Sequence, residues 1–184
     1  MTFTLPPPGI NVTLLALIAV AAVYDMLYRR IPNWLTISGV LAGLALNTFI
    51  YQGWPGLRLS LTGLAVGFGA YFALYSLRAM GAGDVKLMAA IGALTGVRDW
   101  FGIFLITAVV GGFAGLALVA MRGRTKRTLW NVGFILSEIK HGRPAYVNRE
   151  ELDVKSPKSV GLPHGAMIAL GTVLFLGISA RFTP

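Results

Sequence analysis

The sequence of 184 residues contains no cysteine, only two histidines and only seven acidic residues. Without cysteine the chain has no disulfide bonds, no cysteine-ligated zinc site and no thiol nucleophile. The two histidines lie in different sequence contexts and do not suggest a histidine-rich metal site, so we expect neither a metal nor a cofactor. Any catalytic chemistry has to be sought first among the few carboxylates.

Charge of both signs is scarce. Charged residues make up 12% of the chain and hydrophobic residues 55%, whereas soluble domains carry about 25% charged residues. Six apolar segments can be drawn, and all but the fourth are long enough to cross a hydrocarbon core of about 30 Å. The fourth is either a partial span or a helix that starts inside a cavity. The sequence therefore predicts an all-α, polytopic transmembrane bundle of about six spans, with residues 1–184 forming one domain. The segments are Ile10–Leu27, Trp34–Tyr51, Leu57–Leu77, Val85–Thr95, Trp100–Met121 and His164–Ala180.

The basic residues support this division. If all six segments cross, 13 lysines and arginines lie on one side and 3 lie on the other, as the positive-inside rule requires. We therefore expect both termini on the outer side of the membrane. The net charge of +9 is then explained by topology rather than by binding to nucleic acid.

The longest polar stretch is a basic cytoplasmic loop at about residues 122–163. Apolar residues repeat at helical spacing beside Trp130, at Leu129, Val132, Leu136 and Ile139. This pattern favours a short helix that lies on the membrane surface and contacts membrane lipid, anionic lipid included. The alternative is a solvated loop whose arginines only set topology. Within the spans, the pairs Gly39-xxx-Gly43, Gly63-xxx-Gly67 and Gly111-xxx-Gly115 each predict a close helix contact.

Two aspartates stand apart from the other acidic residues. Asp25 lies near the inner end of the first span and Asp84 at the inner start of the fourth, and an ionisable group at membrane depth is a functional candidate. Each also has a plainer interpretation. Asp25 could pair with Arg29 one helical turn later, and Asp84 could be an ordinary helix cap after Gly81-Ala82-Gly83.

Together the two aspartates supply the two carboxyl groups that a carboxylate dyad requires. Two neighbouring carboxyl groups share one proton, so the ionised group can take a proton from water while the other polarises a carbonyl. Gly81 and Gly83 can adopt positive φ and have no side chain, so a substrate backbone could approach Asp84 closely. Glycines would also suit a simple loop at this place.

These residues also carry a resemblance. Gly81-Ala82-Gly83-Asp84, followed by Val85-Lys86-Leu87-Met88, resembles the Gly-x-Gly-Asp signature of the type IV prepilin peptidases, which are aspartic membrane proteases. Asp25 followed by Arg29-Arg30-Ile31-Pro32-Asn33 is similar to the first aspartate motif of that family. Leu162-Pro163-His164-Gly165 resembles its Pro-Tyr-Gly element, with histidine in place of tyrosine.

The resemblance implies that Asp25 and Asp84 are the catalytic pair and that the substrates are prepilins or pseudopilins. It implies removal of a short basic leader at the cytoplasmic face of a prokaryotic cytoplasmic membrane. The absent cysteines and the short connection after the first span resemble the compact branch associated with Tad/Flp pili, for which we expect no N-methyltransferase activity. Lys86 either orients Asp84, meets a substrate carbonyl or only sets topology. Supporting roles are implied for Gly81, Gly83, Lys86, Pro32, Asn33, Pro163 and His164.

Two other functions use the same features. A small proton-coupled transporter or channel could employ Asp25 and Asp84 as a proton relay, but it predicts symmetry between the chain halves, which we do not find. A membrane scaffold without activity predicts that replacing either aspartate by asparagine is harmless.

Overall fold

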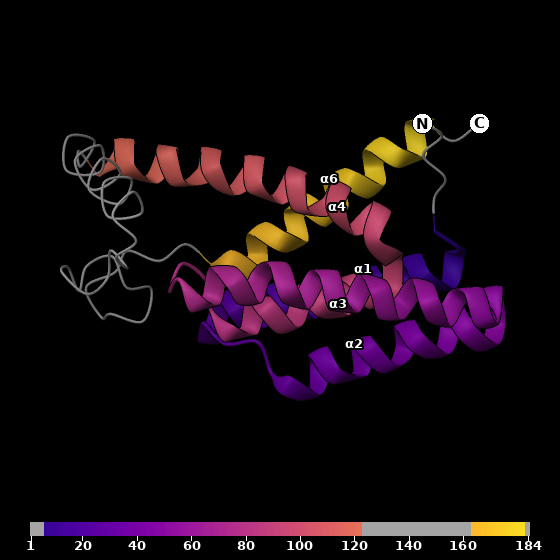
Figure 1. Ribbon diagram of the computed structural model, residues 1–184. Helices are drawn as coiled ribbons and strands as arrows, with labels where there is room; N and C mark the ends of the chain where they lie inside the picture. The colour runs from indigo at the N-terminus through magenta and orange to yellow at the C-terminus, as the bar shows by residue number, and fades with distance from the viewer. Residues whose placement is uncertain (1–5, 123–162, 183–184) are drawn as a thin grey trace, which may run out of the picture.

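The computed structural model describes residues 6–122 and 163–182, and every regular element within these ranges is a helix. The predicted all-α fold is confirmed. Five of the described helices are long and apolar enough to cross a membrane, with α2 and the π-helical η1 acting as one continuous span. The elements are α1 (Pro8–Tyr28), α2 (Asn33–Ala45), η1 (Leu46–Gln52), α3 (Trp54–Ser76), α4 (Ala82–Met121) and α6 (His164–Phe182) (Figure 1).

The 40-residue helix α4 contains the predicted fourth and fifth segments. It breaks at Gly96, where φ is 75° and ψ is 174°, and its second part runs back toward the end of the bundle where the helix began (Figure 1). Positive φ is readily adopted by glycine, so Gly96 alone reverses the chain between the predicted fourth and fifth segments. Residues 97–99, which separate the predicted fourth segment from the fifth, are already helical.

A buried asparagine of η1 satisfies the backbone next to this break. The Asn47 side-chain amide donates to the carbonyl oxygens of Ala93 and Leu94, both at 3.2 Å, and to the hydroxyl of Ser60 at 2.9 Å. Asn47 is only 1% exposed. Carbonyls at a helix break within a membrane protein need such partners, because lipid offers none.

The first part of α4 forms the centre of the bundle. Its residues 87–96 are all buried, and two of the predicted glycine pairs pack against it. On α2, a Cβ at Gly43 would lie 2.7 Å from the backbone carbonyl of Ala93. On α3, Gly63 approaches the backbone of Gly92, and a Cβ at Gly67 would lie 2.5 Å from the Met88 oxygen. Small residues therefore bring α2 and α3 close to α4.

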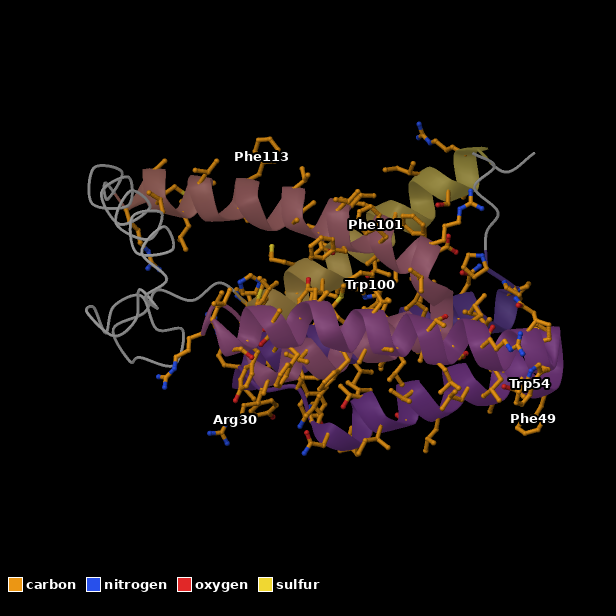
Figure 2. The ribbon with its side chains drawn as sticks, in the orientation of Figure 1. Arg30, Phe49, Trp54, Trp100, Phe101 and Phe113 are labelled. Carbon is orange, nitrogen blue, oxygen red and sulfur yellow. The ribbon has the colours of Figure 1, made fainter. Side chains whose placement is uncertain are left out.

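The outer surface is apolar, as lipid contact requires. Phe113 is 71% exposed and points away from the bundle, while Trp100 lies inside and donates to the Met88 carbonyl at 3.1 Å (Figure 2). The third glycine pair belongs to this outer part. A Cβ at Gly111 would meet nothing within 4 Å, so the predicted helix contact at Gly111-xxx-Gly115 was wrong for Gly111. Gly111 belongs to the second part of α4, whereas the glycines of α2 and α3 pack against the first part.

The contact of α3 with α4 leads to a stability prediction. A Cβ at Gly63 would clash with the Gly92 carbonyl and lie 2.8 Å from the Gly96 Cα. We expect Gly63→Ala to destabilise the bundle by about 1–3 kcal/mol, as overpacking does, seen as a lower thermal midpoint in detergent. Gly69→Ala on the same helix is the control, because a Cβ there meets nothing within 4 Å. Equal midpoints for the two variants would contradict the observed packing.

One end of the bundle collects the segments that carry the sequence motifs. The connections after α1 and α3, the last turn of α4 and the start of α6 all lie there, and Arg30 marks this end in Figure 2. Trp54 and Phe49 lie at the opposite end. The direction in which each helix runs between the two ends agrees with the predicted topology. Which end of the bundle faces the cytoplasm stays a prediction. The basic loop and its expected surface helix fall within residues 123–162, outside the described residues.

Candidate active site

Asp25 lies in the last turn of α1 and is held by the first turn of α6. Its carboxylate Oδ2 accepts a hydrogen bond from the Gly165 backbone N–H at 2.8 Å, and the side chain is 8% exposed. The helix ends just beyond it, at Arg29, which has a left-handed conformation with φ of 54° and donates its N–H to the Asp25 carbonyl. Asp25 is thus fixed at the point where α1 stops.

Asp84 is the third residue of α4 and is 7% exposed. Its Oδ2 accepts the backbone N–H of Gly81 at 3.2 Å, so the expected capping role is present, in a form where the aspartate reaches back to the residue before the helix. This bond orients the carboxylate.

Neither glycine of the motif has positive φ, which corrects that expectation. Among the described residues only Gly53 and Gly96 are glycines with positive φ. Gly81 and Gly83 are needed for space instead. A Cβ at Gly81 would lie 3.1 Å from Asp84 Oδ2, and one at Gly83 would lie 3.3 Å from the Ile31 Cβ. The absence of side chains lets the start of α4 sit directly against the connection between α1 and α2.

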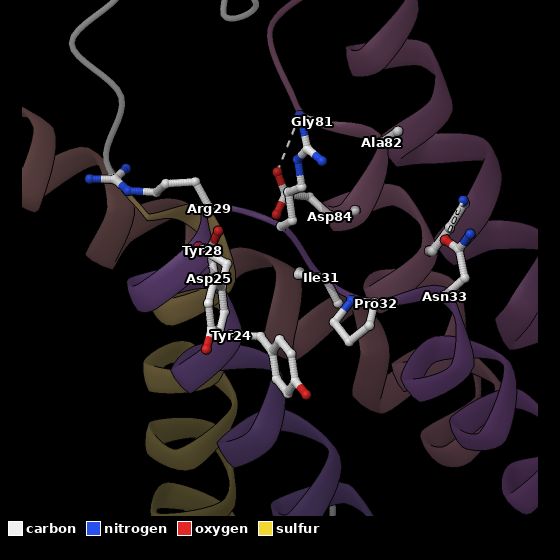
Figure 3. Close-up of a pocket in the computed structure, with 13 residues that line it drawn as sticks. Tyr24, Asp25, Tyr28, Arg29, Ile31, Pro32, Asn33, Gly81, Ala82 and Asp84 are labelled. Carbon is white, nitrogen blue, oxygen red and sulfur yellow. Dashed lines mark hydrogen bonds between the residues drawn. The ribbon is translucent and has the colours of Figure 1, made fainter.

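The two aspartates open onto one cavity of about 680 Å³. Asp84 lies on its α4 side and Asp25 on its α1 side, with Ile31 and Pro32 in the connection beside them (Figure 3). The side chains of His164 and Asp25 are near enough to interact electrostatically with the carboxylate of Asp84. The cavity is lined by Tyr24, Asp25, Tyr28, Arg29, Arg30, Ile31, Pro32, Asn33, Gly81, Ala82, Gly83, Asp84 and Lys86.

Lys86 crosses from α4 to the beginning of α2. Its ammonium group donates to Asn33 Oδ1 at 2.8 Å, in an exposed position at the edge of the cavity. A charged donor gives a stronger bond than a neutral one. Lys86 is thus bonded to Asn33, and this contact connects two motifs that are far apart in the sequence.

Most residues singled out in the sequence meet at this cavity. Pro163 and His164 do not line it. Pro163 directly precedes α6 and His164 is its first residue, so both lie next to Gly165, which holds Asp25. Gly165 belongs to a motif noted in the sequence, but no contact with Asp25 was predicted for it. The sequence did not single out Tyr24 and Tyr28, although both tyrosines lie within one helical turn of Asp25. Among the described residues, no three histidine, aspartate or glutamate side chains gather as they would around a metal ion.

Comparisons with known proteins agree on one family. Residues 12–116 match the type IV leader peptidase family. A prepilin leader peptidase/N-methyltransferase of Myxococcus xanthus is 31% identical over 130 residues, which cover 67% of this chain and 37% of the relative. A protein of the same description from Burkholderia pseudomallei is 32% identical over 118 residues, 60% of this chain and 37% of the relative. One from Aeromonas hydrophila is 30% identical over 105 residues, which cover 53% of this chain and 36% of the relative.

The chain thus spans a little over a third of the length of the curated relatives it matches. No solved structure matches it significantly. The family match nevertheless covers more than half of the chain, and it contains both Asp25 and Asp84 and most of the two helices that carry them. With its several apolar spans and this match, the multi-pass membrane protein belongs to the type IV leader peptidase family.

Proposed function

We propose that this protein is a membrane aspartic endopeptidase that removes the short basic leader from prepilins of the Tad/Flp type. Asp25 and Asp84 are the catalytic pair. One observation carries the proposal: two buried carboxylates from different helices line the same cavity at one end of a transmembrane bundle. The names of the relatives, prepilin leader peptidase/N-methyltransferase, support the substrate class.

The reaction is hydrolysis by an activated water. One aspartate is ionised and removes a proton from a water in the cavity, and the protonated partner donates a hydrogen bond to the scissile carbonyl. The water oxygen bonds to the carbonyl carbon. The peptide C–N bond then breaks, and the leaving nitrogen takes up a proton. No covalent intermediate with the enzyme is formed.

Backbone groups prepare the two carboxylates for this task. The Gly165 N–H holds Oδ2 of Asp25, and the Gly81 N–H holds Oδ2 of Asp84. Both donors belong to the main chain at the start of a helix, so their positions are set by the packing of α6 and α4. Such preorganisation removes the need to orient the acids during the reaction.

The cytoplasmic face is proposed from the distribution of charge. The cavity lies at the end of the bundle that contains Arg29, Arg30 and Lys86, and the predicted topology puts 13 of the 16 basic residues on that side. Both termini would then face outward. The connection between α1 and α2 is short, from Arg29 to Pro32, which supports the compact Tad/Flp-type branch and peptidase activity without N-methylation.

The direct test is to incubate the purified protein in detergent with prepilins of the Tad/Flp type and a methyl donor, and to record the masses of the prepilins. We expect each substrate to lose the mass of its leader, with no added methyl group. Intact substrate in the presence of folded protein would contradict the peptidase proposal. A pH-driven flux in liposomes that occurs without any cleavage would support the proton-relay alternative instead.

A further inference from the structure

An apolar groove of about 370 Å³ runs along the bundle next to the aspartate cavity. Its walls come from Ile37 and Leu41 of α2 and from Leu64 and Phe68 of α3, and Ala89 of α4 lies at its floor. Ile37 is 58% exposed and Leu41 is 61% exposed. These side chains face outward at a depth where the surrounding solvent of a membrane protein is lipid. The groove is therefore open to the side of the bundle.

The groove exists because α2 and α3 both pack on α4 rather than on each other. Gly39 and Gly43 bring α2 against residues 90–94, and Gly63 and Gly67 bring α3 against the opposite flank of the same helix segment. The two helices meet near η1 and diverge toward the end that contains the aspartates (Figure 1).

Two residues belong to both spaces. Asn33 and Lys86 line the aspartate cavity and also the groove, and their hydrogen bond of 2.8 Å lies at the border. Lys86 has a long and flexible side chain on an exposed position, so it can swing aside without disturbing the core. A chain that passes between the aspartates has a continuous route into the groove across this pair.

We infer that the groove binds the apolar helix of the substrate immediately after the cleaved bond. The inference rests on the proposed function. A segment that lies in a groove open to lipid must be helical, because its backbone groups have no other partners there. The scissile peptide between the aspartates must instead be extended to be attacked. Asn33 and Lys86 lie where the substrate passes from one form to the other, and they offer polar partners to the backbone groups freed at that point.

Two substrates separate this inference from the proposed function. The first is a full-length prepilin with its apolar helix. The second is a soluble peptide that contains the leader and the cleavage junction but ends before the helix. We expect Leu41→Trp, which fills the groove, to lower the cleavage rate of the full-length substrate by about tenfold or more, since pocket shape is worth this much. The rate with the soluble peptide should change by less than about twofold.

Leu116→Trp is the matched control, because Leu116 is a similarly exposed leucine, 67%, on the outer part of α4. It should leave both rates unchanged. A Leu41→Trp variant that slows both substrates equally, or neither, would overturn the groove inference and leave the peptidase proposal standing. If the wild-type protein cleaves neither substrate, the proposed function fails and the groove inference falls with it.

Photocrosslinking gives a second readout, which also decides the case in which only the full-length substrate is cleaved. A photoreactive residue at position 41 or 116 is introduced into the Asp84→Asn variant, which keeps the substrate intact. We expect crosslinks from position 41 to the apolar helix and none from position 116. Crosslinks of equal yield from both positions, or from position 116 alone, would overturn the inference.

Discussion

Asp25→Asn and Asp84→Asn should each abolish leader removal, with a loss of at least about a thousandfold in rate, because general acid–base groups contribute on this scale. Asparagine has nearly the same shape as aspartate, and its carbonyl oxygen can still accept the backbone N–H of Gly165 or Gly81. It cannot exchange a proton with water or with its partner. The rate is measured by mass spectrometry of a cleaved prepilin, and the fold by protein abundance and thermal midpoint.

Asp99→Asn provides the control for this pair. Asp99 is a partly buried aspartate next to the Gly96 break, at the opposite end of the first part of α4, and its replacement should leave cleavage unchanged. Asp84→Glu should fail as well, because the added methylene moves the carboxylate by about 1 Å and such shifts cost about a hundredfold. Ordinary processing by either asparagine variant would show that the altered residue is not half of the catalytic pair.

Gly165→Val should have the second largest effect, although Gly165 carries no reactive group. A Cβ at this position would lie 3.0 Å from the Asp25 Cβ and 3.1 Å from both Asp25 Oδ2 and Ile31 Cδ1. The added side chain therefore displaces Asp25 and Ile31 of the connection that follows it, and so changes the position of the Asp25 carboxylate relative to Asp84. We expect the cleavage rate to fall by about a hundredfold, as for other displacements of about 1 Å.

The comparison for this variant is Gly177→Val in the same helix, where a Cβ meets nothing within 4 Å. It should keep the wild-type rate. Gly165→Ala should fall between wild type and Gly165→Val, since its single methyl group needs a shift of only a few tenths of an ångström. If Gly165→Val processes prepilin at the wild-type rate, the contact between α6 and Asp25 does not position the catalytic group.

Local patterns in the chain were enough to identify the helices and the candidate acids. Long apolar runs predict spans because the backbone must satisfy its own hydrogen bonds in lipid. The ends of α1, α3 and α6 differ from those of the predicted segments by at most a few residues. Asp25 and Asp84 could be singled out because so few charges occur near the spans. These inferences need only short stretches of sequence.

Features that depend on neighbours distant in the chain were missed. The predicted fourth segment ends at Thr95 and the fifth begins at Trp100, which places the reversal of α4 within four residues. The sequence does not reveal that Asn47 from another helix donates to the Ala93 and Leu94 carbonyls beside it. Likewise, Gly63 packs closely and Gly111 does not, although their motifs look alike. A glycine pair only permits close approach, and another helix has to be there to use it.

The candidate site shows the same division. The chain's composition and motifs dictate an apolar helical bundle with two carboxylates near one of its ends, because solvation by lipid constrains each segment separately. Their shared cavity, the Gly165 N–H on Asp25 and the groove bordered by Asn33 and Lys86 arise only when the helices pack. Packing depends on the shapes of several helices at once, and no single stretch of sequence contains that information.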